Sequence, residues 1–371
     1  MIHVLRSSAH AHPQWRTCGG GRRSAQIEEI LRGHGIVWQD TFSSPRPTRR
    51  ALLATILRLR LTAPVIRMRP RRSLLRYLAD DYLRHRWFFA HHPEVRVFVV
   101  EECTDYARLR AARAAGVGII SLPHNLETWQ QSPARDFYSG EGPPAAIHRE
   151  AIFSALSDVV FCISREEQWF LTNHGAVTDY LPYHPPAAER TRLGRIRARR
   201  QVRSPEPGQL LAVASGRNTR NRAGLQALAR QIALLPEESR VHLHLGGQAL
   251  GDLPEQLRSP RCTFHGELNE EQLETLMVRC HAAVVYQESG VGALTRIPEM
   301  LCAGLPVLAN AHAARSAYHL PGVTIFHDLN ELTRLATQYL HLPPVPVPDQ
   351  AAEARLVSWV TRLAARRPRL D

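Results

Sequence analysis

A loop with two glycines between two apolar runs is the part of this sequence whose residue types and spacing point most directly to chemistry. Val284–Asn310 reads VVYQESGVGALTRIPEMLCAGLPVLAN, which predicts a strand, a loop with Gly290 and Gly292, an amphipathic helix and a second strand. The loop amides and the positive end of such a helix can hold a phosphate without a cationic side chain. Glu299, inside the helix, is better suited to accept hydrogen bonds from sugar hydroxyls. Glu288, in the loop, could stabilise the helix or contact a ligand.

Two arginines lie in a second candidate loop. Ser215–Gly224 reads SGRNTRNRAG and follows the apolar run Leu210–Ala214. It therefore lies at the carboxyl end of a predicted strand, where ligands collect in open α/β sheets. Arg217 and Arg222 frame the loop, and their guanidinium groups could bind one diphosphate together. The alternative is that both are solvated side chains in a chain that is rich in arginine.

The elements that must position these loops alternate along the whole chain. Apolar runs and segments of helical spacing follow one another in both halves, which is typical of doubly wound parallel sheets. Ser164 and Glu167 form a capping-box pattern, so Ser164 is interpreted as a helix cap rather than a nucleophile. The predicted strands are Ile2–Leu5, Val95–Val100, Val117–Leu122, Val159–Ile163, Leu210–Ala214, Val241–Leu245, Cys262–His265, Ala282–Tyr286 and Pro306–Ala309.

Two domains are expected, because 371 residues exceed the size at which one hydrophobic core normally stops growing. Arginines and prolines replace apolar residues between positions 186 and 208, which predicts a linker there. The N-terminal domain is then expected over 1–185 and the C-terminal domain over 209–340. A tail with a last helix, 341–371, could pack back on the first domain.

Charge and composition limit the classes of partner and compartment. The net charge is +13, the sequence pI is about 10.2 and all 47 basic residues are arginine, which favours partners rich in phosphate. Residues 46–89 place apolar helical spacing and the cluster Trp87-Phe88-Phe89 among arginines, so this region could lie on an anionic membrane surface or pack on the first sheet. Nucleic acid is an unlikely partner, since no nucleic-acid module is recognisable.

Cysteine spacing and hydropathy indicate a cytoplasmic protein, which could lie at the inner face of the membrane. The six cysteines are far apart with no C-x-x-C pair, which favours buried free thiols over disulfides or zinc ligands. No run of 18 or more apolar residues occurs, so no transmembrane span is expected.

Four short sequence blocks follow one another in the second half of the chain. They are Ser215–Gly224, VHLHLGG (Val241–Gly247), FHGEL (Phe264–Leu268) and Gly292–Asn310. In this order and spacing they resemble the nucleotide-sugar-binding domain of GT-B glycosyltransferases of the group 1, family 4-like type. The resemblance spans Leu210–Asp328 and implies two Rossmann-like doubly wound domains facing a central cleft, with the sugar donor on the second domain.

The resemblance also implies residue roles. The implied catalytic residues Arg217 and Arg222 would bind the donor diphosphate, the glycine loop would cradle it, and Glu299 would hold the ribose hydroxyls. The implied donor-binding residues are Gly216, Phe264, Gly266, Glu288, Gly290, Val291, Gly292, Ala293 and Glu299, with Phe264 and Gly266 near the base. Two positions depart from the pattern. Arg222 replaces a lysine, and Val291 stands where the family has its first glutamate, a role that Glu288 could take only if the loop is rearranged.

The first half resembles the same family more faintly and supplies candidates for the acceptor side. Gly20 and Gly21 follow the first strand, where the backbone of this fold approaches phosphate. His124, Asn125 and Glu127 follow another predicted strand in the segment PHNLE, which is similar to an H-N-x-E segment of the family. His124 could hydrogen-bond the sugar or assist proton transfer as a catalytic residue, or it could be a loop histidine bonded to the backbone.

These observations favour a glycosyltransferase that moves a sugar from a nucleoside-diphosphate sugar to a glycan or lipid-linked acceptor in polysaccharide or glycoconjugate synthesis. No cofactor is expected beyond the nucleotide sugar as co-substrate, and no metal, since no D-x-D pair follows a predicted strand. The alternatives are a nucleotide-sugar epimerase or hydrolase on the same fold, and a non-catalytic, arginine-rich binder of nucleic acid or anionic surfaces.

Overall fold

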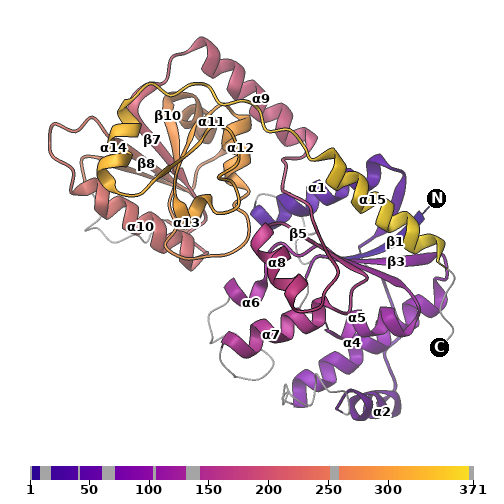
Figure 1. Ribbon diagram of the computed structural model, residues 1–371. Coiled ribbons are helices and arrows are strands. Elements are labelled where there is room, and N and C mark those ends of the chain that lie inside the picture. Colours follow the sequence, from indigo (N-terminus) through magenta and orange to yellow (C-terminus); the bar gives the residue numbers. More distant parts are fainter. Residues whose placement is uncertain are drawn as a thin grey trace. The chain divides into compact units, whose positions relative to one another are not determined.

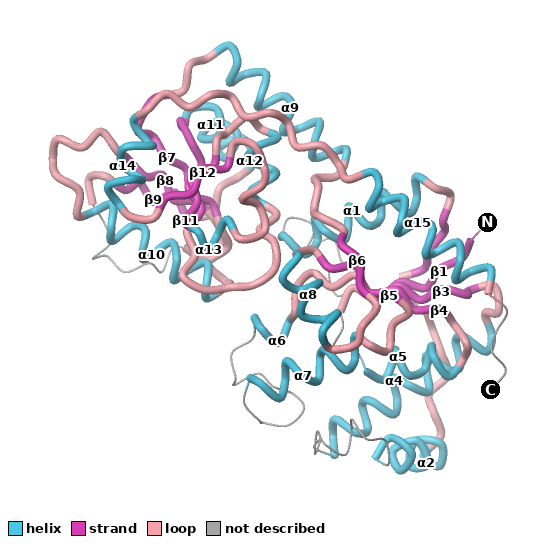
Figure 2. The backbone as a smooth tube through the Cα atoms, in the orientation of Figure 1, coloured by secondary structure: helices cyan, strands magenta, loops and turns pink. Residues whose placement is uncertain are grey.

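Two parallel six-stranded sheets organise the chain, one in each of two units (Figures 1 and 2). The computed structural model describes residues 2–8, 18–40, 42–60, 72–102, 106–130, 143–250 and 259–366. Unit 1 comprises Met1–Pro182 and Asp349–Asp371, and unit 2 comprises Tyr183–Pro348. Helices lie on both faces of each sheet, so the predicted α/β class with two doubly wound domains is confirmed.

The sheet of unit 1 has the strand order β2-β1-β3-β4-β5-β6, and every pairing is parallel. All residues of β4 and β5 are buried, because helices cover both faces of the central strands. The strand order reverses between β1 and β3, which makes their carboxyl ends the expected ligand site of this unit. The strands are β1 (Ile2–Ser7), β2 (Ile36–Gln39), β3 (Val95–Val100), β4 (Gly118–Ser121), β5 (Val159–Cys162) and β6 (Thr178–Tyr180).

Helices from both ends of the chain cover the sheet of unit 1. One face carries α1 (Gly19–Gly33) and α15 (Gln350–Ala365), and the other carries α2 (Arg49–Arg60), α4 (Arg72–His91) and α5 (Tyr106–Ala114). Helices α6 (Glu127–Gln130), α7 (Pro143–Ser154) and α8 (Arg165–Asn173) complete the unit. A Cβ at Gly118 would lie 2.8 Å from the Cβ of Leu363, so glycine there allows α15 to pack onto β4.

The sheet of unit 2 has the order β12-β11-β10-β7-β8-β9, again with parallel pairings only. Counted from β7, this is the 3-2-1-4-5-6 order of a dinucleotide-binding Rossmann sheet. The order reverses between β7 and β10, so the loops after these two strands are where a ligand is expected. The strands are β7 (Glu206–Val213), β8 (His242–Gly246), β9 (Cys262–Gly266), β10 (Cys280–Val285), β11 (Val307–Asn310) and β12 (Val323–Phe326).

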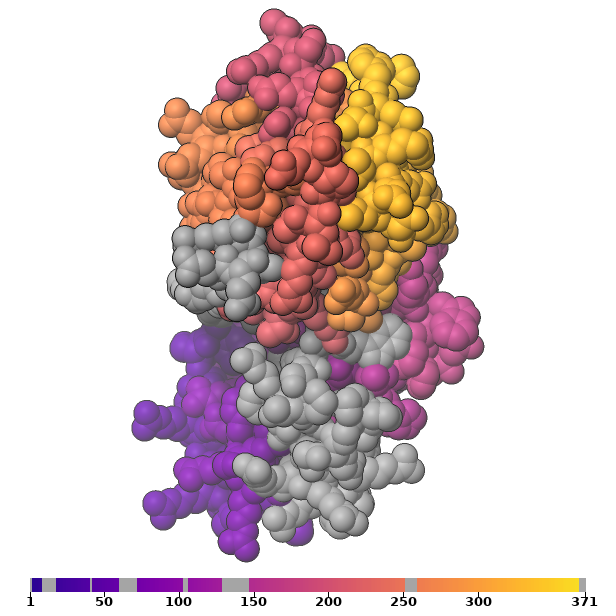
Figure 3. All heavy atoms as spheres, turned by 90° about the vertical axis from the view of Figure 1, so that its left-hand side faces the viewer, coloured from indigo at the N-terminus to yellow at the C-terminus, as the bar shows by residue number. Residues whose placement is uncertain are grey.

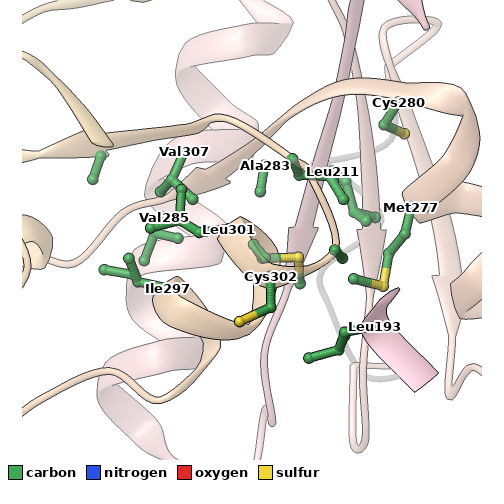
Figure 4. Packing of buried hydrophobic residues seen from close by; sticks show 14 of the residues in the cluster. Leu193, Leu211, Met277, Cys280, Ala283, Val285, Ile297, Leu301, Cys302 and Val307 are labelled. Atoms are coloured by element: carbon green, nitrogen blue, oxygen red, sulfur yellow. The ribbon is translucent and has the colours of Figure 1, made fainter. Parts of the chain in front are cut away.

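Two layers of helices enclose this second sheet. Helices α9 (Ala187–Val202), α11 (Glu270–Arg279) and α12 (Arg296–Cys302) share one hydrophobic cluster with it, in which Leu193, Met277 and Ile297 meet strand residues (Figure 4). Helices α10 (Thr219–Ala233) and α14 (Leu329–Thr337) cover the other face, and the short α13 (Ala311–Ala314) follows β11. The outer side of α10 is exposed on the surface of unit 2 (Figure 3).

The predicted linker over 186–208 was wrong, because most of it is helix α9 of unit 2. Leu193 and Ile196 are fully buried against α11 and α12. Arg200 is also buried, and its guanidinium donates to carbonyl groups at the end of α11 and around β10. Two apolar residues and one arginine that binds backbone are enough to dock this helix, although its composition is that of a solvated segment.

The aromatic cluster at the end of α4 belongs to the core of unit 1. Phe88 and Phe89 are buried, and their rings lie against Phe42 and Phe98. Of the two alternatives for this region, packing on the first sheet therefore holds for Phe88 and Phe89. None of the helices in the described part of the chain is long and apolar enough to cross a bilayer.

The cysteines that the structure describes are free thiols, as predicted. They are Cys18, Cys162, Cys262, Cys280 and Cys302, whereas Cys103 lies outside the described residues. Burial raises the pKa of Cys280 to about 12 and that of Cys262 and Cys302 to about 11. These three thiols are therefore protonated and unreactive at neutral pH.

Candidate functional site

The first candidate site lies where the strand order of unit 2 reverses. The loop after β7 begins helix α10, and the loop after β10 leads to α12. A Cβ at Gly224 of α10 would collide with the carbonyl oxygen of Tyr286, so glycine brings this helix against the end of β10. The fold therefore places the two loops that the sequence singled out side by side at one edge of the sheet.

The carbonyl groups of the glycine loop are all turned toward one side. They accept hydrogen bonds in three pairs: Gly290 O with His312 Nε2 at 3.2 Å, Val291 O with Arg315 Nη2 at 2.7 Å, and Gly292 O with Ser316 Oγ at 3.1 Å. In a trans peptide the N–H points opposite to the preceding carbonyl. The amides of Val291, Gly292 and Ala293 therefore point away from these donors, and in the described part of the chain they make no hydrogen bond.

A polar network behind the loops holds them together. Asn221 Oδ1 accepts from Gln287 Nε2 at 2.9 Å and from Arg296 Nη1 at 3.4 Å. Arg315 donates to Gln287 Oε1 at 3.1 Å, and Asn310 exchanges two hydrogen bonds with the backbone of Gln287. Burial, together with Arg315 nearby, lowers the pKa of Arg296 to about 10, so it stays charged at neutral pH. Two fixed guanidinium groups thus lie close to the glycine loop.

The two arginines predicted from the sequence lie at the N-terminal end of α10. Arg217 is exposed and Arg222 is half-buried. Asn218 caps this helix, and its side chain accepts from the amides of Arg220 and Asn221. The cap uses two of the amides at this end of the helix, and Arg217 and Arg222 remain the side chains predicted to contact an anion there.

The remaining predicted donor residues of the loops occupy the same edge. Gly216 packs against the backbone of Ala249, where a Cβ would lie 2.5 Å from the carbonyl oxygen. Phe264 is half-buried in β9, and Gly266 ends this strand with a φ of +67°. Glu288 is exposed, and whether it takes the role of the absent glutamate at Val291 stays a prediction.

Glu299 is buried rather than open to solvent. It lies in the first turn of α12, its residue is 4% exposed, and its Oε1 accepts a hydrogen bond of 2.7 Å from the hydroxyl of Tyr183. Tyr183 is 7% exposed and is a partner that the sequence did not indicate.

A second polar cluster lies where the strand order of unit 1 reverses, and its centre is Glu101 at the end of β3. Glu101 Oε1 accepts from Arg6 Nε at 2.6 Å. Its Oε2 accepts from Ser8 Oγ at 2.6 Å, from Ser24 Oγ and from His124 Nε2 at 3.0 Å. The sequence singled out His124 but missed the other four residues.

The ionisation of Glu101 determines where His124 carries its proton. Burial would raise the pKa of Glu101, but the hydrogen bond from His124 and the charge of Arg6 outweigh burial and hold this pKa at about 2. An ionised carboxylate can only accept hydrogen bonds, so the Nε2 of His124 must carry a hydrogen. In the neutral imidazole the basic atom is then Nδ1. The structure therefore gives His124 a defined tautomer.

The carboxyl groups of Glu127, Glu150 and Glu167 lie near one another at the segment that carries His124. Glu167 accepts from the amide of Leu126 at 2.8 Å, and Glu150 accepts from the amides of Glu127 and Thr128 at 2.9 Å each. Burial, with Glu150 nearby, raises the pKa of Glu127 to about 8, and burial raises that of Glu167 to about 7. Among the described residues, no group of three or more His, Cys, Asp or Glu could hold a metal ion. We interpret the cluster as a support for this segment.

The other acceptor-side candidates are arranged differently from the expectation. Gly20 and Gly21 do not form a loop but lie in the first turn of α1, where the amide of Gly21 donates to the Sγ of Cys18 at 3.4 Å. Asn125 is half-buried beside His124, and Glu127 begins α6. Within unit 1, the structure thus brings His124 together with Glu101 rather than with the glycines.

Comparisons with known proteins show a shared fold at low sequence identity. No protein-family model matches the chain, and no curated protein sequence matches it significantly. HepE of Anabaena, solved in complex with UDP and glucose, is similar with a TM-score of 0.54 and 15% identity, over 99% of this chain and 96% of that chain. Sucrose-phosphate synthase of Thermosynechococcus elongatus gives 0.52 and 14%, over 98% and 92%. UDP-GlcNAc 2-epimerase of Methanocaldococcus jannaschii gives 0.51 and 10%, over 97% and 99%. These likenesses, together with its two Rossmann-like sheets, give this chain the GT-B fold.

Proposed function

We propose that this protein is a glycosyltransferase that takes a sugar from a nucleoside-diphosphate sugar, and that the loops after β7 and β10 bind the donor diphosphate. The observation that carries the proposal is the geometry of the glycine loop. Its carbonyl groups are held by His312, Arg315 and Ser316, so its amides face the opposite way. Amides turned outward beside guanidinium groups, at the point where a Rossmann sheet reverses its order, make a binding site for pyrophosphate.

The same groups supply the catalytic contribution of unit 2. As the bond between sugar and phosphate breaks, negative charge grows on the departing diphosphate. The amides of Val291, Gly292 and Ala293 and the side chains of Arg217 and Arg222 stabilise that charge, and fixed donors of this kind provide much of the rate enhancement in many enzymes. On this proposal no cofactor and no metal ion is needed.

His124 of unit 1 is proposed to act on a hydroxyl of the sugar or of the acceptor. Its tautomer is fixed by Glu101, and carboxylates behind it hold the backbone of residues 126–128. A histidine that is oriented in this way can accept a hydrogen bond or a proton at Nδ1.

Substitution of either arginine at the start of α10 is expected to weaken binding of a nucleoside diphosphate by about tenfold or more, because each removes hydrogen bonds to a charged group. The measurement is a titration with UDP, GDP, ADP and CMP for the wild type, Arg217→Ala and Arg222→Ala, with and without EDTA. Arg230→Ala is the matched control, since Arg230 is an exposed arginine in the last turn of the same helix. Equal affinities in all variants would contradict the proposed diphosphate site, and loss of binding in EDTA would contradict its independence of metal.

An epimerase or hydrolase activity is the second candidate, because UDP-GlcNAc 2-epimerase is similar in fold. Analysis of the products separates it from sugar transfer. A transferase consumes the donor only when an acceptor is present, whereas an epimerase or hydrolase changes the donor alone. A non-catalytic binder of nucleic acid would instead bind single-stranded RNA with a steep dependence on salt that Arg217→Ala leaves unchanged.

A lipid-linked acceptor at the cytoplasmic face of a membrane fits the surface of α2. Leu52 and Ile56 pack into unit 1, whereas Leu53 and Leu57 are 68% and 62% exposed. Arg49, Arg50 and Arg58 are exposed on the same helix. Exposed leucines among arginines suit a surface of anionic lipid.

The double variant Leu53→Asp/Leu57→Asp is expected to lose most of its binding to vesicles, because it removes the apolar contacts and adds repulsion from anionic lipid. Sedimentation with vesicles of phosphatidylglycerol and phosphatidylcholine measures the effect. Leu234→Asp is the control, since Leu234 is an 81% exposed leucine of unit 2. A wild-type chain that does not sediment with anionic vesicles would refute the membrane proposal.

A further inference from the structure

We propose that Arg315 is a positioning residue that sets which way the peptide between Val291 and Gly292 faces, so that without this arginine the glycine loop presents an oxygen instead of an amide to the diphosphate. The inference rests on the proposed function and adds to it a residue outside the loops after β7 and β10. It follows from a bond between the side chain of Arg315, which follows α13 in the chain, and the backbone of the glycine loop.

The local backbone of the loop leaves the orientation of this peptide open. Gly292 has a φ of +70°, and glycine adopts positive and negative φ about equally readily. A peptide plane beside a glycine can therefore rotate to face the other way while the chain on either side keeps its course. Since the carbonyl and the following N–H point in opposite directions, this rotation exchanges a donor for an acceptor at the phosphate. Groups outside the loop must therefore set the orientation.

Arg315 makes the strongest of the contacts that set it. Its Nη2 donates to Val291 O at 2.7 Å, whereas the bonds from His312 and Ser316 to the neighbouring carbonyl groups are 3.2 and 3.1 Å long. A charged donor also makes a stronger hydrogen bond than a neutral one. Burial and the nearby charge of Arg315 lower the pKa of His312 from its ordinary value, so at neutral pH this imidazole is a neutral donor.

The guanidinium of Arg315 is held by two further acceptors and has a defined place before any ligand binds. Its Nη1 donates to Gln287 Oε1 at 3.1 Å and to the carbonyl of His312 at 2.6 Å. A Cβ at Gly290 would lie 3.1 Å from Gln287 Oε1 and 3.6 Å from Arg315 Nη2, so glycine there lets the loop lie directly on this pair. The two alanines that precede Arg315 are buried in the core of unit 2. A positioning group needs such support.

Removal of the guanidinium has a specific consequence for the loop. In Arg315→Met the new side chain fills much of the same space, but Val291 O loses its donor. A carbonyl without a partner costs free energy, and rotation of the peptide allows water to reach it on the side where the amides now lie. The diphosphate then meets an oxygen where it met an N–H, whereas the rest of the nucleotide is unaffected.

The experiment measures dissociation constants for two probes, which are the one of UDP, GDP and ADP that binds tightest and its nucleoside. Arg315→Met should weaken the diphosphate about tenfold or more and the nucleoside less than about twofold. Arg315→Lys should return the diphosphate to within about threefold of the wild type, because an ammonium keeps a charged donor for Val291 O. Arg334→Met is the matched control and should change neither, since Arg334 is 56% exposed on α14 and lies 3.7 Å from Glu331.

A spectroscopic readout separates orientation from loss of a positive charge. Labelling with ¹³C-valine and ¹⁵N-glycine selects the Val291–Gly292 peptide and one other, Val117–Gly118, which belongs to unit 1 and serves as an internal reference. In the wild type, the Gly292 amide signal should move downfield on saturation with the diphosphate, because the amide then donates to phosphate. In Arg315→Met this shift should be absent at saturation, whereas a change of charge alone would leave it in place.

The outcomes distinguish this inference from the proposed function. If Gly292 still shifts in Arg315→Met, or if Arg315→Lys binds the diphosphate as weakly as Arg315→Met, the inference is wrong while the diphosphate site stands. Equal weakening of diphosphate and nucleoside, or weakening of neither, contradicts it in the same way. If the wild type does not bind a nucleoside diphosphate, the proposed function and this inference both fail.

Discussion

Glu101→Gln is expected to reduce sugar transfer by about 10²–10⁴-fold, the range that a correctly oriented acid–base group contributes. Glutamine replaces one carboxylate oxygen by an amide nitrogen that donates. If the nitrogen takes the place of Oε2, it faces the hydroxyls of Ser8 and Ser24 and the Nε2–H of His124; if it takes the place of Oε1, it faces Arg6. In the first orientation the nitrogen opposes the Nε2–H of His124, whereas in the second it opposes Arg6 and the amide oxygen still accepts from His124. Glutamine therefore no longer enforces a single tautomer of His124, and it removes the negative charge beside the imidazole ring.

Two readouts separate this effect from general destabilisation. Binding of the nucleoside diphosphate should be unchanged in Glu101→Gln, because the residues proposed to bind it belong to unit 2. The ¹⁵N spectrum of the His124 ring should change from the Nε2–H tautomer in the wild type to a mixture of tautomers in the variant. Glu94→Gln is the control, as the side chain of Glu94 is 50% exposed at the start of the β3 region. Full activity of Glu101→Gln would show that neither residue takes part in the reaction.

Glu101→Gln breaks the buried ion pair between Glu101 and Arg6, which is the main way in which it can destabilise unit 1. Arg6 keeps Glu28 and Asp40 at 3.7 and 3.6 Å, so its charge is not left alone. Breaking a buried pair outright costs about 3–5 kcal/mol, and the two remaining carboxylates should keep the cost below that. A chain with this variant is therefore expected to fold.

The central strands and both donor loops could be predicted from the sequence because their signal is local. The strand β3 matches the prediction of Val95–Val100 in full, since five of its six residues are apolar and only Arg96 interrupts the run. The strands that were not predicted are β2, β6 and β12, and each lies at an edge of its sheet. An edge strand is covered less completely and therefore carries a weaker apolar pattern. Thr178–Tyr180, for example, has one buried residue in three.

The cluster around Glu101 could not be predicted because its members are distant in the sequence. Arg6 and Glu101 are 95 residues apart. Arg6 follows the predicted strand Ile2–Leu5 and Glu101 follows Val95–Val100, and a charged residue after an apolar run is typical of the start of a loop. Only the strand order, with β1 beside β3, brings them together. The contact of Glu167 with residue 126 could not be predicted for another reason, since its sequence pattern indicated a capping box. Ser164 does cap α8, but the carboxylate of Glu167 bonds the amide of Leu126 instead of closing the capping box.

Arg200→Met is expected to destabilise unit 2 by about 3–5 kcal/mol. The guanidinium of Arg200 is 4% exposed and donates to the carbonyl groups of Met277, Val278, Cys280, His281 and Gly304. Burial lowers its pKa to about 10, so it is still charged at neutral pH and binds these oxygens as a cation. Methionine fills the space but leaves several buried acceptors without a donor, which is the costly half of a broken hydrogen bond.

Hydrogen exchange can test this within one molecule, because the two units need not unfold together. Protection of the β10 amides, Ala282–Val285, should fall about 100-fold or more in Arg200→Met, while protection of the β3 amides in unit 1 stays constant. Arg199→Met is the matched control, since Arg199 is the preceding residue, is 55% exposed and lies 3.7 Å from Glu274. It should change protection by less than about threefold, as exposed ion pairs contribute little. Unchanged protection of β10 in Arg200→Met would mean that the carbonyl groups find other donors. Helix α9 would then be held to unit 2 mainly by Leu193 and Ile196.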